Sequence, residues 1–450
     1  TGIFLGSGNA IYTAGPGGAI LAFLIIGIMI YFLMTSLGEM AALYPVTGSF
    51  CDYCTRFVDP AFGFAMSWNY WFNWAITVAV DLSAAGIIMQ FWFPHVPIFY
   101  WSGLFLGLIF LLNLGAVGLY GELEYGFSAI KITTVIIFII VGLLIIAGII
   151  GHHKPFDLSN WTHGDAPFHQ GWYGIVMVMM VAGFSFQGTE IFGVTAGEAE
   201  NPRESIPRAI KSIFWRILIF YILAMSIINF IIPYTDSSLV NPDNKVALSP
   251  FTIIFKEAGL QSAASILNMI ILTAILSAAN ASMYTSTRTL WYMAKQGIAP
   301  RIFGKATRKS VPRAALVATA IIGAMTFLTS LFGSGKIFMW LVNVSSLSGF
   351  IAWLGIAISH YRFRKAWTRQ GNTIASLPFR AKLFPLGPLF TIALCTMIMA
   401  GQVMLIDKFS WTGFMSIFIN IPVFLILYLG YKFYYRTQIV PLDLAHNNAG

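Results

Sequence analysis

The segment from Gly183 to Glu190 combines helix-breaking residues with a carboxylate inside a stretch that is otherwise apolar. It reads Gly-Phe-Ser-Phe-Gln-Gly-Thr-Glu, and its flanks, residues 171–182 and 191–196, carry no charge. A carboxylate in the middle of a membrane costs several kcal/mol unless it is paired or faces a water-lined cavity. Broken helices are tolerated at that depth only where their backbone lines such a cavity. These residues therefore predict the binding site of a transporter for a cationic substrate.

The composition places this segment in a membrane protein. Apolar residues make up 58% of the 450 residues and charged residues only 10%, whereas soluble domains have about 25% charged residues. A chain with so few charged groups needs a lipid bilayer around it. With about 20 residues per span plus loops, its length accommodates twelve transmembrane helices.

Apolar runs mark the helices that must carry the segment. The clearest runs cover residues 17–37, 132–150, 314–335, 337–359, 383–406 and 409–431, and less uniform runs cover residues 62–93, 98–117, 172–196, 210–232 and 263–292. Residues 1–8 are expected to form the outer half of a further span, whose inner half would precede residue 1. We therefore predict an all-α integral membrane protein.

Basic residues predict the orientation of the helices. The stretch from Arg288 to Arg313 contains seven basic residues and no acid, and the stretch from Arg362 to Lys382 contains six and no acid. Because short cytoplasmic loops are enriched in Lys and Arg, both termini are expected in the cytoplasm. The net charge of +9 thus reflects membrane topology, and a nucleic-acid partner is not expected.

Two predicted breaks, at residues 1–2 and 183–188, lie five spans apart. Five helices cannot repeat in the same orientation across a membrane, so the repeat must be inverted. We predict one transmembrane domain over residues 1–440, with helices 1–5 at about 1–150, helices 6–10 at about 171–362 and helices 11 and 12 at about 383–433. Helices 1 and 6 are discontinuous in this prediction, and residues 441–450 form a cytoplasmic tail.

Motifs for enzymatic or metal chemistry are missing from the sequence. Cys51 and Cys54 have the spacing of a metal or redox pair, but no second pair accompanies them, so coincidence is the better interpretation. No H-E-x-x-H, Walker or nucleophile-elbow sequence occurs. We therefore expect neither an enzyme nor a cofactor or metal.

Several segments resemble bacterial amino-acid permeases of the amino acid–polyamine–organocation superfamily. They are residues 1–4, 38–50, 183–190, 196–209 and 277–288. Within that group, residues 183–190 and 349–364 resemble the lysine-specific permeases, and the resemblance extends over essentially the whole chain. It implies a secondary transporter that imports L-lysine across the bacterial inner membrane, with protons as the coupling ion.

The backbone at the two breaks suits the α-groups of an amino acid. The outer half-helix that begins at Thr1, Gly2 and Ile3 presents free N–H groups and a positive dipole end to the substrate carboxylate. The half-helix that ends near Gly183 to Ser185 presents carbonyls to the α-ammonium. Alternatively, Thr1 and Ser185 only cap helix ends.

A second ammonium requires its own anion, and Glu190 is the candidate. Phe184 and Phe186 are expected to enclose the aliphatic chain, with Phe184 as a gate. The alternatives are that the two phenylalanines face lipid and that Glu190 belongs to a structural ion pair.

Lys131 and Asp81 are the candidates for proton coupling. The family resemblance implies that Lys131 occupies the position of a sodium ion and carries the proton, whereas snorkelling to the interface is the alternative. Asp81 is a possible carboxylate partner for the proton or the substrate, or else pairs two helices.

Further polar residues are assigned to the gate or to neutral substrate contacts. Glu198 and Arg208 are expected at an inner gate, where Glu198 pairs with Arg203 or Arg208. Asn343 and Ser346 are candidates for hydrogen bonds to the substrate, although such residues also join helices in bilayers. The same holds for the polar residues Asn280 and Ser345.

Three other functions remain open at this point. The substrate could be arginine, ornithine or a neutral aromatic amino acid, although a neutral substrate would leave Glu190 without a charged partner. An exchanger would need no titrating Lys131. A membrane sensor that binds an amino acid without moving it would be expected to have a large soluble domain, and no stretch of this sequence is long enough to form one.

Overall fold

The computed structural model describes most of the chain and is helical throughout that part. The described residues are 2–46, 48–115, 117–151, 155–191, 193, 201–239, 249–259, 261–307, 311–329, 334–405 and 418–445. Within them there is no β-strand. This agrees with the prediction of an all-α protein.

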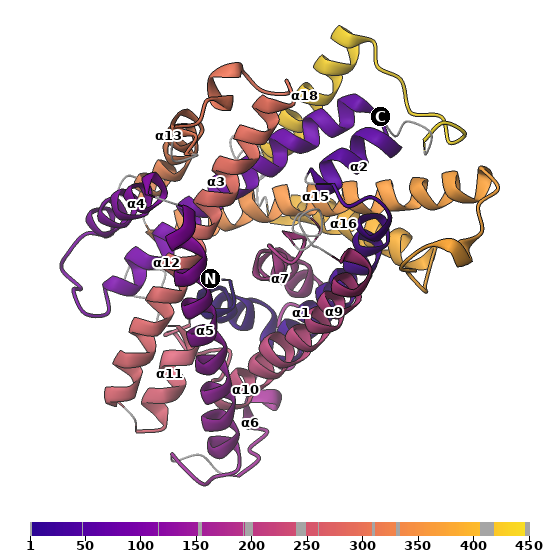
Figure 1. The fold of residues 1–450 in the computed structure, drawn as a ribbon. Helices are drawn as coiled ribbons and strands as arrows, with labels where there is room; N and C mark the ends of the chain where they lie inside the picture. Colours follow the sequence, from indigo (N-terminus) through magenta and orange to yellow (C-terminus); the bar gives the residue numbers. More distant parts are fainter. Residues whose placement is uncertain are drawn as a thin grey trace. The chain divides into compact units, whose positions relative to one another are not determined.

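The helices follow one another along the chain as Figure 1 shows. They are η1 (Gly2–Gly6), α1 (Ser7–Leu43), α2 (Ser49–Phe57), α3 (Pro60–Met89), α4 (Ile98–Leu114), α5 (Val117–Ile146), α6 (Ser159–Thr162), α7 (Gly171–Phe186), α9 (Pro202–Arg216), η3 (Ile217–Leu223), α10 (Ala224–Ile231), α11 (Pro250–Glu257), α12 (Gln261–Lys295), η4 (Arg301–Gly304), α13 (Arg313–Gly323), η5 (Ala324–Leu328), α15 (Ser334–Arg369), η6 (Ile374–Ser376), α16 (Leu386–Gly401), η7 (Gln402–Leu405) and α18 (Asn420–Tyr435).

The long helices coincide with the apolar runs of the sequence. Six helical stretches among the described residues are long and apolar enough to cross a membrane. In lipid, a helix is favoured because it satisfies every backbone N–H and C=O within the segment itself. Apolar length therefore predicted these elements well.

Helix α1 is interrupted at Gly15. This residue has φ 72° and ψ 175° and is followed by Pro16, and a positive φ favours glycine. The carbonyl of Pro167 accepts the N–H groups of Gly17 and Gly18, at 2.9 and 3.2 Å. The N–H groups left free by the break are thus capped by a loop.

The break in the sixth predicted span lies later than the sequence suggested. Helix α7 continues through Gly183 and Ser185 to Phe186. The chain then turns over Gln187 to Glu190, where Gly188 has φ 92°. Gly183 is accommodated within the helix, and Gly188 is the glycine that the backbone conformation requires.

The chain forms two compact units, each assembled from separate segments. The first comprises residues 1–24, 71–185 and 218–345, and the second comprises residues 25–70, 186–217 and 346–450. In the first unit α12 contacts α4, α5, α11 and α13. In the second unit Ala41 and Ala42 of α1 pack with Ile206 and Ile210 of α9. Each unit is described separately below.

Candidate functional site

The Glu190 carboxylate is buried and is held by neutral donors. Only 1% of this residue is exposed. The backbone N–H of Gly188 lies 3.3 and 3.1 Å from its two carboxylate oxygens, and the indole N–H of Trp353 on α15 donates to Oε2 at 3.3 Å. The turn that follows α7 therefore positions the carboxylate, and a residue far along the chain secures it.

No cationic side chain among the described residues pairs with Glu190. The structural ion pair that was the alternative for this residue is thus not found in that part of the chain. Both neighbouring phenylalanines are buried, with Phe184 6% and Phe186 0% exposed. Neither phenylalanine faces lipid.

In the first unit, the beginning of the chain lies directly against the end of α7. A Cβ atom at Gly2 would lie 2.3 Å from Oγ of Ser185 and 2.7 Å from its Cα atom. Gly2 is therefore required because a side chain there would collide with Ser185. Ile3 beside it is partly buried, and Thr1 lies outside the described residues.

The carbonyl of Ser185, which the sequence suggested for the α-ammonium, accepts a hydrogen bond from the hydroxyl of Tyr221 at 2.9 Å. The Ser185 hydroxyl donates to the carbonyl of Val181 at 3.0 Å. A carbonyl has two lone pairs, so one acceptor position is taken. Tyr221 was missed because it stands in an apolar run without any distinguishing pattern.

Lys131 on α5 donates to the hydroxyl of Ser277 on α12 at 2.9 Å. The ammonium of this half-buried side chain is thus held between two helices of the first unit. Asp81 on α3 is 1% exposed. Both candidates for proton coupling lie in the first unit.

Two other polar candidates join helices. Asn113 donates to Asn280 at 2.7 Å, which connects α4 to α12. Ser345 exchanges a hydrogen bond with Thr77 at 2.8 Å and donates to Asn73 at 3.3 Å. These contacts match the role of polar residues as links between helices in bilayers.

The remaining candidates are distributed differently. Ser346 is buried and Asn343 is half-buried, both on α15. Arg208 is paired with Glu204 at 3.1 Å on the surface of α9, where both side chains are more than 60% exposed. Glu198, its expected partner, lies outside the described residues.

A second buried carboxylate, Glu39 near the end of α1, was not singled out as a functional residue. Arg364 of α15 donates to it through Nε at 2.6 Å and through Nη2, and Nε2 of His360 lies 3.3 Å away. The backbone N–H of Ala381 donates to the same carboxylate at 2.6 Å. Arg364 belongs to the basic run that was interpreted as a loop, whereas the structure buries it in an ion pair.

The Cys51 and Cys54 pair on α2 is not suited to redox chemistry. Both thiols are buried, and burial raises the pKa of Cys51 and raises that of Cys54 to about 12. Since the thiolate is the reactive form, such thiols are inert near neutral pH. Among the described residues, no cluster of His, Cys, Asp and Glu could hold a metal ion.

Comparison with solved structures shows the fold. The chain is similar to a mutant form of a manganese transporter from Eremococcus coleocola, with a TM-score of 0.53 and 15% identity. The match covers 95% of this chain and 89% of the transporter.

Comparison with characterised sequences shows much closer relatives. The chain is 54% identical to the lysine-specific permease of Escherichia coli (strain K12), over 98% of this chain and 91% of that protein. It is 52% identical to the lysine-specific permease of Lactococcus lactis subsp. cremoris (strain MG1363), over 98% and 88%. The histidine permease of the same strain is 49% identical over 98% and 93%. The model of the amino acid permease family matches residues 1–443, and this multi-pass membrane protein therefore belongs to the amino acid permease family.

Proposed function

We propose that this protein imports L-lysine across the bacterial inner membrane and uses proton entry to drive the uptake. The family is one of permeases, so the chain is a transporter and not an enzyme. The observation that carries the substrate assignment is a buried carboxylate, Glu190, that no described cation neutralises. High identity to two lysine-specific permeases supports the same substrate.

Charge complementarity explains why Glu190 would select lysine. The side-chain amine of lysine has a pKa of about 10.4, so lysine carries a second positive charge at neutral pH. A buried carboxylate gains stability when a cation enters its site, because an unpaired buried charge is costly. In this proposal Phe184 and Phe186 enclose the aliphatic chain, and Phe184 also serves as a gate.

The backbone near the two breaks would bind the α-groups of the substrate. Residues Thr1 to Ile3 are proposed to bind its carboxylate, and the carbonyls near Ser185 its ammonium, with Asn343 and Ser346 as further hydrogen-bonding groups. Among the described residues, Tyr221 takes one of the two acceptor positions of the Ser185 carbonyl, which is compatible with this role. The inner gate is assigned to Glu198 and Arg208.

The proposal includes a topology for the membrane. Twelve helices with an inverted five-helix repeat, followed by helices 11 and 12, would leave both termini in the cytoplasm. Access would alternate by movement of one helix bundle against another around the site. The distribution of basic residues supports this orientation.

Histidine is the alternative substrate that a specific observation favours. A histidine permease is 49% identical to this chain, only a few per cent below the two lysine permeases. Uptake of labelled lysine and labelled histidine by the purified protein in proteoliposomes decides between them. Preferential uptake of histidine would reject the lysine assignment.

Lys131 is proposed to carry the coupling proton, with Asp81 as the candidate carboxylate partner. Replacing Lys131 with glutamine should lower lysine uptake driven by an inward proton gradient at least tenfold, because the amide cannot exchange a proton. Exchange of lysine against lysine, which needs no net proton movement, should persist. Both activities are measured in the same proteoliposomes.

The matched control is Lys211→Gln, which changes an exposed lysine of α9. This variant should retain proton-driven uptake. If Lys131→Gln also retained it, the coupling proton would have to be carried by another group.

A further inference from the structure

Trp353 on α15 makes the one side-chain hydrogen bond that Glu190 receives from the described residues. Its indole ring is 1% exposed and packs edge to face against Phe350, with the ring centroids 5.2 Å apart and the ring planes at 84°. The indole has little freedom to move because protein atoms surround it. The position of its N–H is therefore set by the packing of α15.

Helix α15 approaches the turn at residues 187–190 closely enough to make this bond. A Cβ atom at Gly349 would lie 2.3 Å from Nε2 of Gln187. Gly349 and Trp353 are four residues apart and lie on the same face of the helix. Gly349 thus permits the close approach of α15 to the turn, and this approach brings Trp353 within hydrogen-bonding distance of Glu190.

A comparison with Glu39 shows what is unusual about these donors. Glu39 is also buried in the second unit, but the Arg364 guanidinium neutralises it. Glu190 receives a neutral indole N–H and a neutral backbone N–H. Neutral donors orient a carboxylate without removing its net charge, which remains available to a cationic ligand.

We propose that Trp353 is a positioning residue for substrate specificity. Its indole N–H fixes the Glu190 carboxylate at the place where it meets the ammonium of a substrate side chain as long as that of lysine. This proposal rests on the proposed function. Without the bond, the carboxylate can adopt other rotamers and accept amines at other distances. Discrimination between lysine and ornithine, which is one methylene shorter, should then weaken.

The test is the variant Trp353→Phe, which retains an aromatic ring and removes the N–H donor. Uptake kinetics in proteoliposomes should show a KM for lysine raised about tenfold, because hydrogen bonds to charged groups are strong. The ratio of kcat/KM for lysine to that for ornithine should fall about tenfold. If Trp353 had only a structural role, kcat/KM would fall equally for lysine and for ornithine. The ratio would then be unchanged, and this result would overturn the proposal.

The control is Trp367→Phe on the same helix, where the indole donates to the carbonyl of Thr373 at 3.0 Å. This variant loses an equivalent donor away from Glu190 and should keep the parent ratio. If the parent protein failed to transport lysine, the proposed function would fail independently of Trp353. An unchanged ratio in an active Trp353→Phe variant would reject only the positioning role.

A separate set of contacts lies in the second unit. The strap, defined here as residues 437–445, follows α18 and binds both α2 and α15. The Val440 N–H donates to the carbonyl of Val58 at 2.9 Å, and Gln370 donates to the carbonyl of Leu442 at 2.9 Å. The Arg362 guanidinium of α15 bonds the carbonyls of both Phe57 and Val440.

Asp59, between α2 and α3, anchors the same strap. Its carboxylate accepts the Thr437 hydroxyl at 2.8 Å and pairs with Lys432 of α18. Burial alone would raise the pKa of Asp59, but the hydrogen bonds from Lys432 and Thr437 outweigh it and lower the pKa. Asp59 is therefore an anionic anchor at neutral pH.

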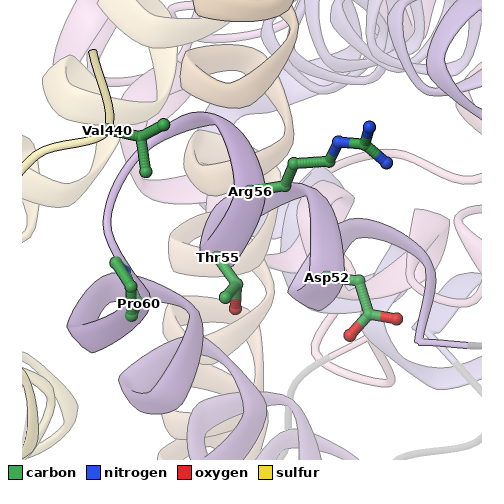
Figure 2. A pocket seen from close by; sticks show the side chains of 5 residues that line it. All are labelled: Asp52, Thr55, Arg56, Pro60 and Val440. Carbon is green, nitrogen blue, oxygen red and sulfur yellow. The ribbon is translucent and has the colours of Figure 1, made fainter. Parts of the chain in front are cut away.

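A pocket is lined by residues of both the strap and α2. Figure 2 shows the side chains that line it, which come from α2, from Pro60 and from Val440 of the strap. The volume of this pocket is about 340 Å³. The strap is attached to its neighbours by the hydrogen bonds described above. Loss of one backbone bond should therefore loosen it measurably.

We infer that the strap is a conformational device that holds α2 against α15. The Cys54 thiol of α2 accepts a hydrogen bond from Ser359 of α15 at 3.3 Å, and both cysteines of α2 are buried beneath this arrangement. When the strap is released, α2 separates from α15 more often. Cys51 and Cys54 then become accessible.

The test is the labelling rate of each cysteine by a small membrane-permeant maleimide, followed by peptide mass spectrometry. Val440→Pro removes the N–H that bonds Val58 and should speed labelling of Cys51 and Cys54 about tenfold. Ile439→Pro, at an exposed neighbouring position, should match the parent. Parent-like labelling of Val440→Pro would overturn the inference.

Cys395 on α16 serves as an internal reference because it is buried elsewhere. Release of the strap should leave its labelling rate unchanged. If all three cysteines reacted in Val440→Pro, general unfolding would be the cause, and the milder Thr437→Val would decide. Faster labelling of Cys51 and Cys54, but not of Cys395, in Thr437→Val would support the role of the strap in holding α2. Parent-like labelling of all three cysteines in this variant would reject that role.

Discussion

Replacing Glu190 with glutamine should reduce kcat/KM for lysine uptake by about a hundredfold or more. The amide keeps the volume of the side chain and removes its charge, so the substrate ammonium would enter a buried site without an anion. Truncation of one partner of a buried charge pair costs about 2–5 kcal/mol, and about 3 kcal/mol corresponds to a hundredfold. The measurement is labelled lysine uptake in proteoliposomes.

The variant Glu190→Asp separates the charge from its position. It retains the carboxylate but withdraws it by one methylene, so an intermediate rate is expected. Norleucine lacks the side-chain ammonium of lysine. It should therefore inhibit lysine uptake only weakly, and to the same extent in the parent and in Glu190→Asp. If Glu190→Gln were folded and transported lysine at the parent rate, the ammonium would have to bind elsewhere, with Asp81 as the next candidate.

Replacing Glu39 with glutamine should destabilise the protein by about 3–5 kcal/mol, the range found when one partner of a buried ion pair is removed. The substitution leaves the Arg364 guanidinium buried at 4% exposure without its anion. The exposed pair of Glu204 and Arg208 provides the control. Glu204→Gln should change stability by less than about 1 kcal/mol, because surface ion pairs contribute little.

Thermal unfolding in detergent, followed by size-exclusion chromatography, measures both variants. Because irreversible unfolding makes operational stability a rate, the half-life at a fixed temperature is compared. It should be much shorter for Glu39→Gln than for the parent, and close to the parent value for Glu204→Gln. The double variant Glu39→Gln with Arg364→Met should recover part of the lost stability, because it removes the uncompensated charge. Equal half-lives for Glu39→Gln and Glu204→Gln would contradict a structural role of the buried pair.

The sequence predicted the helices because membrane insertion imposes a strong local rule. An apolar run of sufficient length must be helical in lipid, and the runs accordingly coincide with α1, α3, α12, α15 and their neighbours. Gly188 also carried a local signal, since the backbone there requires a positive φ. The exact end of α7 carried no local signal, because glycine at residue 183 is compatible both with a helix and with a break.

The partners of the site residues depend on tertiary contacts, which left no local pattern. Trp353 is 163 residues from Glu190, and Arg364 is 325 residues from Glu39. Arg364 stands in a basic run whose composition is that of a cytoplasmic loop, so its burial could not be inferred from its neighbours. Lys131 was identified by resemblance, but its partner Ser277 became evident only from the packing of α5 on α12.

Uptake of labelled lysine by the parent protein, in proteoliposomes with an inward proton gradient, tests lysine import by proton coupling. Lysine should accumulate above its external concentration, in preference to histidine, and the accumulation should collapse when a protonophore removes the gradient. Transport of histidine without transport of lysine would contradict the assignment of lysine as the substrate. Accumulation of lysine that persisted without the gradient would contradict proton coupling.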